Sequence, residues 1–593
     1  MLPIEDYAAI GDGRSVALVG RNGSLDWLCW PRFDSPSLFG AILDERAGHW
    51  RLGPRGAHRA RRRYLPGTNV LETTFETGTG ELRLTDFMSV ESEEEKKQHL
   101  SPDHEIVRIV ECVKGEVEVH MELAPRPDYG ARPVAFRRSA LGVRAELDDA
   151  ALLALQTNMP IEVRPDRVIG AGRLRAGESC ECALDFEDEW PATLPAPGHA
   201  KDALRRTVAW WRWWVEHLDY EGPGRELVER SALVLKLLVY APSGAIVAAP
   251  TTSLPERIGG DLNWDYRFCW LRDASLTVRA LFGLGFPREA EAFVSWLLHA
   301  TRLTWPKLRI LYDVHGECPG AERTLDHLDG YRGSKPVRIG NAAIAQTQLD
   351  VYGEVIDAVT RSVREGARLD RSTQKMLLAF GDYVCRHGGE PDEGIWEPRS
   401  GARHNTHSRL LCWTALDRLL ALREGGHLPD GIVARFRESR DRFARDIREG
   451  AWNEKLGSYV STLGGDELDA SLLLLAWYGF EPADSPRMRA TRARIREHLG
   501  APGGLLYRYK NADSPGEGAF GLASFWDVEY LALGGGSPEE AEGLFLELLG
   551  HANDVGLFAE EIDPATGAAV GNFPQAFTHV GVINAALSLR RAA

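Results

Sequence analysis

The sequence predicts a β + α protein of two unlike parts, an antiparallel β-sandwich followed by a larger domain of paired helices. Two observations predict this division. Over residues 116–123, valine, methionine and leucine alternate with glutamate and histidine, and similar short alternations fill the first ~190 residues, as is typical of half-buried strands. Beyond residue 200, apolar side chains instead recur every three or four residues, which is the spacing of one helix face.

Residues 1–195 are predicted to form the N-terminal β-sandwich domain. Gly78-Thr79-Gly80 separates two alternating runs, 70–77 and 81–87, as a hairpin turn does. We also expect Lys114-Gly115 to be a turn joining strand 106–113 to strand 116–123. Turn signals recur at short intervals and no long helical period appears, which favours an antiparallel sandwich.

Residues 196–224 are predicted to be a helical linker. Leu204, Val208 and Trp211 follow a helical spacing, and the run Trp210–Trp214 places tryptophan on more than one helix face. We therefore expect a helix buried between two domains. The run Glu221–Gly224 ends it.

Residues 225–593 are predicted to be a helical domain built from repeated hairpins. The sequence Asp-Ala-Ser-Leu occurs at 273–276 and again at 469–472, each time before an apolar helix that ends in Gly-Phe. This echo indicates equivalent helix starts in a repeated architecture. At roughly 30 residues for each helix and its loop, the domain has room for about twelve helices. Six hairpins closed into a ring form an (α/α)6 barrel, with the long loops gathered at one end.

Composition restricts the partners of the chain. The net charge is −16 and the isoelectric point about 5.6, which argues against nucleic acid or an anionic membrane as the main partner. No secretory signal is visible at the start, and no apolar segment approaches the ~20 residues of a membrane span. The eight cysteines are scattered without a Cys-x-x-Cys pair, which is typical of free thiols in a reducing cytoplasm. We expect a cytoplasmic protein that binds a small molecule and needs no cofactor or metal; the sequence leaves a homo-oligomer open.

The unusual residues of the helical half lie in four predicted loops, which are Asp265–Asp273, Gly394–Arg399, Gly504–Tyr509 with Glu517–Phe520, and Gly556–Asp563. In the second loop, Glu397 lies between Trp396 and Pro398. A carboxyl group pressed against an indole and partly desolvated keeps its proton at neutral pH, as a general acid must. The alternative is an ordinary surface glutamate beside a core tryptophan.

The first loop offers groups suited to a sugar. Arg272 and Asp273 stand side by side and can hold vicinal hydroxyls by charge-assisted hydrogen bonds, while Tyr266 and Trp270 can form an apolar wall for a sugar face. The alternative is that Asp273 only caps a helix and that Arg272 is its salt-bridge partner. Hydrolysis of a glycosidic bond with inversion needs two carboxyl groups, one to protonate the leaving oxygen and one to deprotonate water.

Seven sequence blocks, in order along nearly the whole chain, resemble glycoside hydrolase family 15, which contains glucoamylases and bacterial and archaeal trehalases. They are IGDGRSVALVGRNGSLDWLCWPRFDSPSLF, WDYRFCWLRD, GYRGSKPVRIGNAA, GIWEPR with HNTHS, GGLLYRY with EGAF and SFW, GLFAEEIDP, and GNFPQAFTH. The resemblance implies a β-supersandwich, a helical linker and an (α/α)6 barrel. It also implies that Glu397 is the general acid and Glu560 the general base. A shift of the match by one residue would make the neighbouring Glu561 the base instead.

The resemblance further implies a sugar site. It places Arg272 and Asp273 on sugar hydroxyls, and Arg508 near the second sugar. The aromatic members of the site are Tyr266, Trp270 and Trp396. We expect burial to raise the pKa of the acid, and the base to stay ionised in a wetter setting.

The function that this resemblance implies is an inverting, exo-acting α-glucoside hydrolase that releases glucose, with α,α-trehalase favoured. The first alternative is a glucoamylase-type glucan 1,4-α-glucosidase acting on malto-oligosaccharides. An inverting disaccharide phosphorylase uses phosphate as the attacking group and needs no base carboxylate, so Glu560 argues against it. A non-catalytic sugar-binding protein would not need to retain both Glu397 and Glu560.

Overall fold

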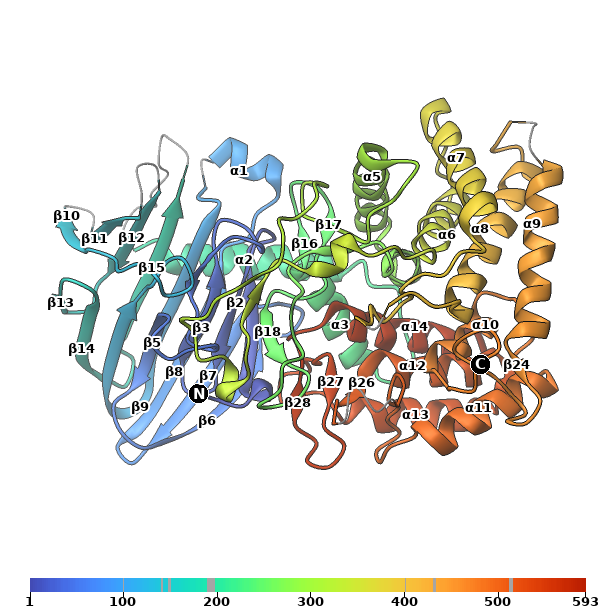
Figure 1. The fold of residues 1–593 in the computed structure, drawn as a ribbon. Coiled ribbons are helices and arrows are strands. Elements are labelled where there is room, and N and C mark those ends of the chain that lie inside the picture. The colour runs from blue at the N-terminus through green and yellow to red at the C-terminus, as the bar shows by residue number, and fades with distance from the viewer. Residues whose placement is uncertain are drawn as a thin grey trace.

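The structure is a computed structural model that describes residues 1–99, 101–139, 142–147, 151–188, 198–399, 401–429, 433–510 and 516–592. A sheet-rich part and a helical part lie side by side (Figure 1). The N-terminus lies against the sheet and the C-terminus lies among the helices. The predicted change from strands to helices near residue 200 is therefore confirmed.

The sheet-rich part contains fifteen strands, and each pairs only with antiparallel neighbours. One short helix, α1 (Glu93–His99), connects two of them. The strands are β1 (Tyr7–Gly11), β2 (Val16–Gly20), β3 (Ser24–Cys29), β4 (Ser37–Phe39), β5 (His49–Pro54), β6 (His58–Tyr64), β7 (Leu71–Thr77), β8 (Gly80–Met88), β9 (His104–Ala124), β10 (Arg137–Ser139), β11 (Gly142–Glu146), β12 (Leu152–Thr157), β13 (Ile161–Val163), β14 (Val168–Arg175) and β15 (Ser179–Glu187).

Strand β9 joins two layers of the sheet. Its first half pairs with β8 and β15, and its second half pairs with β5 and β14. The predicted turn at Lys114-Gly115 is therefore wrong, because the chain runs through these residues as one strand of 21 residues. Gly115 has φ +73, and a Cβ there would lie 2.2 Å from the carbonyl oxygen of Thr79, so only glycine fits at the crossing. The hairpin predicted around Gly78-Thr79-Gly80 is confirmed as β7 and β8.

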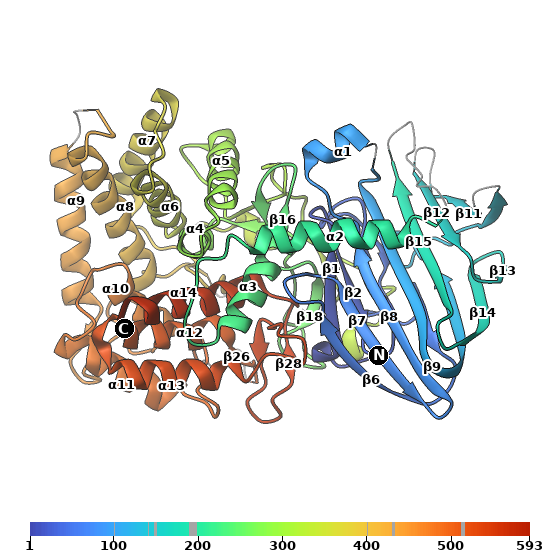
Figure 2. The same cartoon turned by 180° about the vertical axis from the view of Figure 1, so that it is seen from behind.

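Helix α2 (Ala200–Val215) lies across the sheet and ends at the helical part (Figure 2). Trp214 stacks on Phe286 with ring centroids 4.1 Å apart, and its indole nitrogen donates to Glu289. Trp211 is buried as well, but Trp213 is 50% exposed, so the helix keeps one face toward solvent. The expected boundary between residues 195 and 196 lies outside the described residues.

Twelve described helices follow in the C-terminal part. They are α3 (Arg225–Leu237), α4 (Ala274–Gly283), α5 (Pro287–Thr304), α6 (Val351–Arg364), α7 (Arg371–His387), α8 (Thr406–Glu424), α9 (Val433–Arg445), α10 (Leu474–Trp477), α11 (Pro486–Leu499), α12 (Gly521–Tyr530), α13 (Pro538–Leu549) and α14 (Ala576–Ala592). Helices α4, α6, α8, α10, α12 and α14 each pack against the next in this order, and α14 packs back against α4. Helices α3, α5, α7, α9 and α13 pack against members of this circuit, and α11 packs against the turn Ala470–Leu473 that precedes α10.

Short antiparallel ribbons lie in the loops between these helices. Their strands are β16 (Val239–Tyr240), β17 (Ala245–Ile246), β18 (Thr252–Pro255), β19 (Asn263–Asp265), β20 (Cys269–Trp270), β21 (Leu311–Tyr312), β22 (Arg323–Thr324), β23 (Arg338–Ile339), β24 (Trp452–Asn453), β25 (Ser458–Tyr459), β26 (Ala519–Phe520), β27 (Glu561–Ile562) and β28 (Ala569–Val570). None of the described helices combines the length and apolar character needed to cross a membrane.

The two Asp-Ala-Ser-Leu segments occupy equivalent places, as their echo predicted. Asp273 immediately precedes α4, and Asp469 immediately precedes the turn that leads into α10. The sheet-rich part supports the loop before α4 directly. The guanidinium of Arg267, buried and paired with Asp265, donates to the carbonyl oxygen of Ser35 at 2.9 Å, and Trp27 donates to the carbonyl oxygen of Pro250. The N-terminal part thus holds in place the loop that carries Arg272 and Asp273.

Candidate active site

Loops that precede the helices of this circuit bring most of the predicted site residues to one place, whereas Trp270 and Asp273 line neither of the two spaces described below. One narrow chamber is lined by Ala248, Tyr266, Arg272, Trp396, Glu397, Arg508, Phe520, Glu560, Gln575 and Phe577. Glu397 and Glu560, which are 163 positions apart in the sequence, therefore face the same space. Glu397 comes from the loop between α7 and α8, and Glu560 from the loop between α13 and α14.

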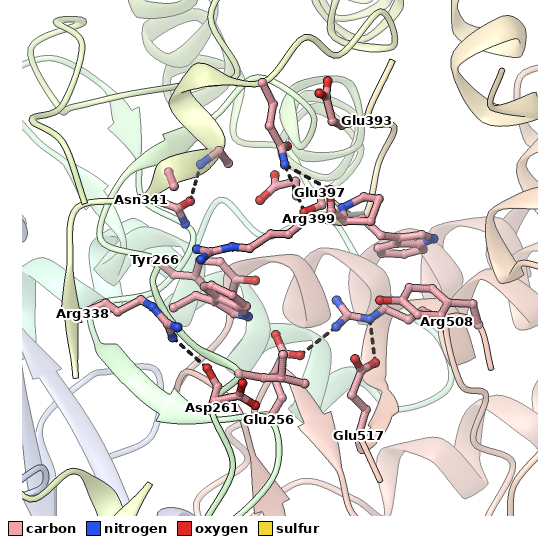
Figure 3. Close-up of a pocket in the computed structure, with 18 of the residues that line it drawn as sticks. Glu256, Asp261, Tyr266, Arg338, Asn341, Glu393, Glu397, Arg399, Arg508 and Glu517 are labelled. Carbon is pink, nitrogen blue, oxygen red and sulfur yellow. Dashed lines mark hydrogen bonds and ion pairs between the residues drawn. The ribbon is translucent and has the colours of Figure 1, made fainter. Parts of the chain in front are cut away.

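A larger cavity of about 650 Å³ continues from this chamber toward solvent. The two spaces share four lining residues, which are Tyr266, Trp396, Glu397 and Arg508. Figure 3 shows Glu397 and Arg399 on one side of this cavity, with Arg508, Glu256 and Glu517 on another. The volume falls within the range of about 300–1,000 Å³ that is usual for small-molecule sites.

Glu397 is held by two donors on one oxygen. Its Oε1 accepts from Nε1 of Trp270 at 2.7 Å and from Nη1 of Arg272 at 3.0 Å. The residue has φ +56, a left-handed conformation that is rare for glutamate, and Gln346 donates to its backbone carbonyl oxygen at 3.2 Å. Burial raises the pKa of the Glu397 carboxyl, and the Arg272 charge opposes that rise. The direction agrees with the expectation for a general acid.

Glu560 is more buried than Glu397, which corrects the expectation of a wetter setting. The residue is 1% exposed, and Oε2 accepts from the backbone N–H of Asn572 at 3.1 Å. Burial raises the pKa of Glu560 to about 7, while Arg508 and the N–H donor oppose the rise. The loop folds back closely here because residue 571 is glycine with φ +78; a Cβ there would lie 2.6 Å from Oε2 of Glu560. Sequence alone gave no signal of this close packing.

The neighbouring Glu561 faces away from the chamber. Its Oε2 accepts from the backbone N–H of Gly518 at 2.9 Å, within the short ribbon formed by β26 and β27. Its Oε1 lies 3.9 Å from Nη2 of Arg508. Glu560 lines the chamber, whereas Glu561, the first residue of β27, does not.

Arg272 and Asp273 form a fixed pair at the start of α4. Nε of Arg272 donates to Asp273 at 2.9 Å, and Nη1 donates to the carbonyl oxygen of Ile395 at 2.8 Å. The Asp273 side chain makes no hydrogen bond to cap the helix, so capping alone does not account for it. Burial raises the pKa of Asp273, and the Arg272 charge opposes this rise.

Comparison with known proteins identifies the family. The model of "Glycosyl hydrolases family 15" matches residues 222–533 and 536–587, and the model "Trehalase-like, N-terminal" matches residues 1–168. The chain belongs to glycosyl hydrolases family 15. It is therefore a glycoside hydrolase, as the seven sequence blocks predicted.

Relatives of this family 15 enzyme match it from end to end. A trehalase of Mycolicibacterium smegmatis is 38% identical over 100% of this chain and 92% of its own. A trehalase of Thermoplasma volcanium is 32% identical over 99% of this chain and 94% of its own. The crystal structure of a bacterial glucoamylase complexed with acarbose superposes with a TM-score of 0.74, covering 99% of this chain and 94% of the other at 13% identity, and so shows that the fold is shared.

In this family 15 enzyme, Arg508 is enclosed by carboxylates, of which Glu256 lies outside the predicted loops. Nη2 lies 2.7 Å from Glu256 and Nε lies 3.2 Å from Glu517. Glu256 is 1% exposed, and burial raises its pKa to about 8 although Arg508 opposes the rise. In the sequence Glu256 lies outside the seven blocks, eight residues before WDYRFCWLRD begins at Trp264.

Among the described residues, the three carboxylates around Arg508 lie close enough together to hold a cation. Oxygen atoms of Glu256, Glu517 and Glu561 lie within 4.8 Å of one another. The Arg508 guanidinium already lies among them, so the protein itself supplies a positive charge at this point. Its pKa is raised because these carboxylates outweigh the effect of burial, which by itself lowers it.

Two aromatic residues differ in how they serve the site. Trp396 lines both spaces, and its Nε1 donates to Asp469 at 2.8 Å, so its ring is fixed beside Glu397. Trp270 is only 2% exposed and meets Tyr266 edge-on, with ring centroids 5.2 Å apart. The expected stacking of a sugar on Trp270 is therefore corrected: this indole supports the Glu397 carboxyl, and Tyr266 is the one of the two that lines the chamber.

Proposed function

We propose that this family 15 enzyme is an α,α-trehalase that hydrolyses its substrate with inversion. The observation that carries the proposal is the presence of Glu397 and Glu560 in one chamber, from loops far apart in the sequence. Full-length relatives named trehalase support the choice of substrate. Glu397 lines both spaces, so the proposal places the bond between the two glucose units where the chamber meets the 650 Å³ cavity.

In the proposed reaction, Glu397 gives its proton to the oxygen that links the two sugars. Glu560 takes a proton from a water molecule on the opposite face of the ring, and the water oxygen forms a bond to the anomeric carbon as the bond to the linking oxygen breaks. The products are two glucose molecules. Glu397 loses one proton in the reaction and Glu560 gains one. Burial raises the pKa of both carboxyls, that of Glu560 to about 7, so Glu560 is ionised above about pH 7, and the assignment of acid and base rests on the family resemblance and not on these shifts.

The remaining groups hold the sugar of the narrow chamber. Arg272 lines the chamber and offers a charged donor to a sugar hydroxyl, and Asp273, which lines neither space, holds that guanidinium in place. Tyr266 and Trp396 supply aromatic surface, and Arg508 marks the boundary with the outer cavity. Arg272 also contacts Glu397, so binding of the sugar and orientation of the acid are coupled through one guanidinium.

We also propose the finer architecture. The closed circuit of six helices with six partners supports an (α/α)6 barrel over residues 225–593, and the two layers joined by β9 support a supersandwich over residues 1–195. Helix α2 supports a linker over residues 196–224. All eight cysteines are free thiols, which supports a location in the reducing cytoplasm.

The test is glucose release from trehalose, maltose and maltotetraose, with and without phosphate. A trehalase releases glucose from trehalose fastest and does not require phosphate as a reactant. A glucoamylase-type enzyme favours maltotetraose, and a phosphorylase forms a sugar phosphate in place of the second glucose.

The catalytic pair is tested by Glu397→Gln and Glu560→Gln, which keep the shape of each side chain. Each should lower kcat by around 10²–10⁴, the usual contribution of a positioned acid or base. Glu390→Gln, at an exposed glutamate beside His387, is the matched control and should leave kcat unchanged. Full activity in either of the first two variants would contradict the assignment.

A further inference from the structure

We propose that Arg399, supported by Trp264 and Glu322, binds the glucose that leaves and so determines preference for the disaccharide. This inference rests on the proposed function. It concerns the half of the substrate that lies outside the narrow chamber. For this second sugar, the family resemblance indicated only Arg508 as a contact.

The division of the cavity shows which residues meet the leaving sugar. Glu397 lines both the narrow chamber and the outer cavity, and it must reach the oxygen between the two sugars. That oxygen therefore lies at the boundary of the two spaces. Residues that line only the outer cavity, among them Trp264, Arg338 and Arg399, face the sugar on the leaving side.

Arg399 follows the acid by two residues and reaches into the same space. Gln346 donates to the carbonyl oxygens of Glu397 and Pro398, at 3.2 and 3.4 Å, and so fixes the backbone from which Arg399 departs. Figure 3 shows Arg399 leaving the chain beside Glu397. Its side chain is 51% exposed, so the guanidinium is available to a ligand.

A rigid support holds this guanidinium in place. Nη2 of Arg399 donates to both carboxylate oxygens of Glu322, at 3.0 and 2.9 Å, and the guanidinium carbon lies 4.4 Å from the ring centroid of Trp264. Glu322 is itself fixed, because it accepts from the backbone N–H of Ala342 at 3.0 Å. Arg338 pairs with the same carboxylate at 3.3 Å and lies 4.6 Å from the same ring centroid.

The chemistry of the arrangement suits a neutral polyol. A guanidinium carries five N–H donors, and only those on Nη2 are directed to Glu322, which leaves donors for sugar hydroxyls. Arg338 shares the Glu322 carboxylate, so the three side chains together keep one net positive charge, and neutral hydroxyls can accept from the free donors of Arg399. Because the support fixes the donors before substrate arrives, little side-chain freedom is lost on binding.

The experiment compares a substrate that places a sugar in the outer cavity with one that does not. Trehalose leaves a glucose there, whereas α-glucosyl fluoride leaves only fluoride. We expect Arg399→Met to lower kcat/KM for trehalose by about 10- to 100-fold, which is the range for losing a charge-assisted hydrogen bond. The same variant should change kcat/KM for α-glucosyl fluoride by less than about twofold, because no sugar then occupies the outer cavity. Arg399→Lys, which keeps the charge but loses the planar donors, should fall between the wild type and Arg399→Met.

Arg403→Met is the matched control, because Arg403 is 52% exposed and pairs with Glu467 at 3.0 Å, yet does not line the outer cavity. It should leave both substrates unchanged. An equal loss on both substrates in Arg399→Met would overturn the inference, because the residue would then act through Glu397. No loss on either substrate would overturn it as well.

Failure of the proposed function gives a different pattern. In that case the wild type hydrolyses α-glucosyl fluoride but leaves trehalose intact. The same comparison made with maltose then decides the role of Arg399: a loss confined to maltose supports contact with the leaving sugar, and equal values for wild type and Arg399→Met contradict it.

Discussion

Replacing Trp270 with phenylalanine should move the alkaline limb of the pH profile upward. The indole Nε1 donates to Oε1 of Glu397 at 2.7 Å, and a donor of this kind favours the charged carboxylate. Loss of the donor therefore raises the pKa of Glu397 further than burial already does. An acid with a higher pKa stays protonated to a higher pH, so the enzyme stays active there.

The size of the shift follows from the strength of one charge-assisted hydrogen bond, about 1.5–3 kcal/mol. At about 1.36 kcal/mol per pKa unit, this corresponds to roughly one to two pH units. Two features reduce the effect. Nη1 of Arg272 remains 3.0 Å from the same oxygen, and 14% of the Glu397 side chain is exposed, so that water can replace the indole. We therefore expect a shift of about one pH unit.

The assay is kcat/KM for trehalose between pH 5 and 10, because this ratio reports the free enzyme that the structure describes. Trp296→Phe is the control: this tryptophan is 3% exposed in α5, and its indole nitrogen has no hydrogen-bond partner among the described residues. Both variants lose the same ring volume, but only Trp270→Phe should shift the limb. A downward shift, or equal profiles for the two variants, would refute the reasoning.

Two further predictions concern the base. Gly571→Ala should lower kcat by roughly 10²-fold, because its Cβ would lie 2.6 Å from Oε2 of Glu560 and displace the carboxylate; Gly567→Ala, with φ +75 and no atom within 4 Å of the new Cβ, is the control that keeps its kcat. Burial raises the pKa of Glu560 to about 7, so kcat/KM should fall as the pH drops through about 7, since a protonated carboxyl cannot take a proton from water. A value that stays flat down to pH 5 would contradict this.

Much of the architecture could be predicted because it depends on short-range patterns. Alternation identified β7 and β8, and the repeated Asp-Ala-Ser-Leu identified two equivalent starts in the helical circuit. The same pattern failed at Lys114-Gly115, because alternation on both sides of a glycine looks alike whether the chain turns back or crosses from one layer to the other. Only the strands that pair with β9 decide between the two.

Some features of the candidate site could likewise be predicted from the sequence, and others could not. The surroundings of Glu397 could be predicted in part, because Trp396 and Pro398 adjoin it in sequence. The role of Trp270 could not, because it depends on Glu397, 127 residues away, and the burial of Glu560 could not, because it depends on how the loop folds back to place Asn572 against it. Glu256 was not predicted as a site residue, because its partner Arg508 is 252 residues away in the sequence.

The central claim is that Glu397 and Glu560 act together as acid and base on opposite faces of one sugar. Such a pair needs room for a water molecule, with the carboxyl groups roughly 6.5–9.5 Å apart, whereas a retaining pair lies at about 5–5.5 Å. The most direct test is proton NMR of the first glucose released from trehalose, recorded before mutarotation. Inversion at one anomeric carbon predicts equal amounts of α- and β-glucose, because the leaving glucose keeps its α configuration. Release of α-glucose alone would contradict the account.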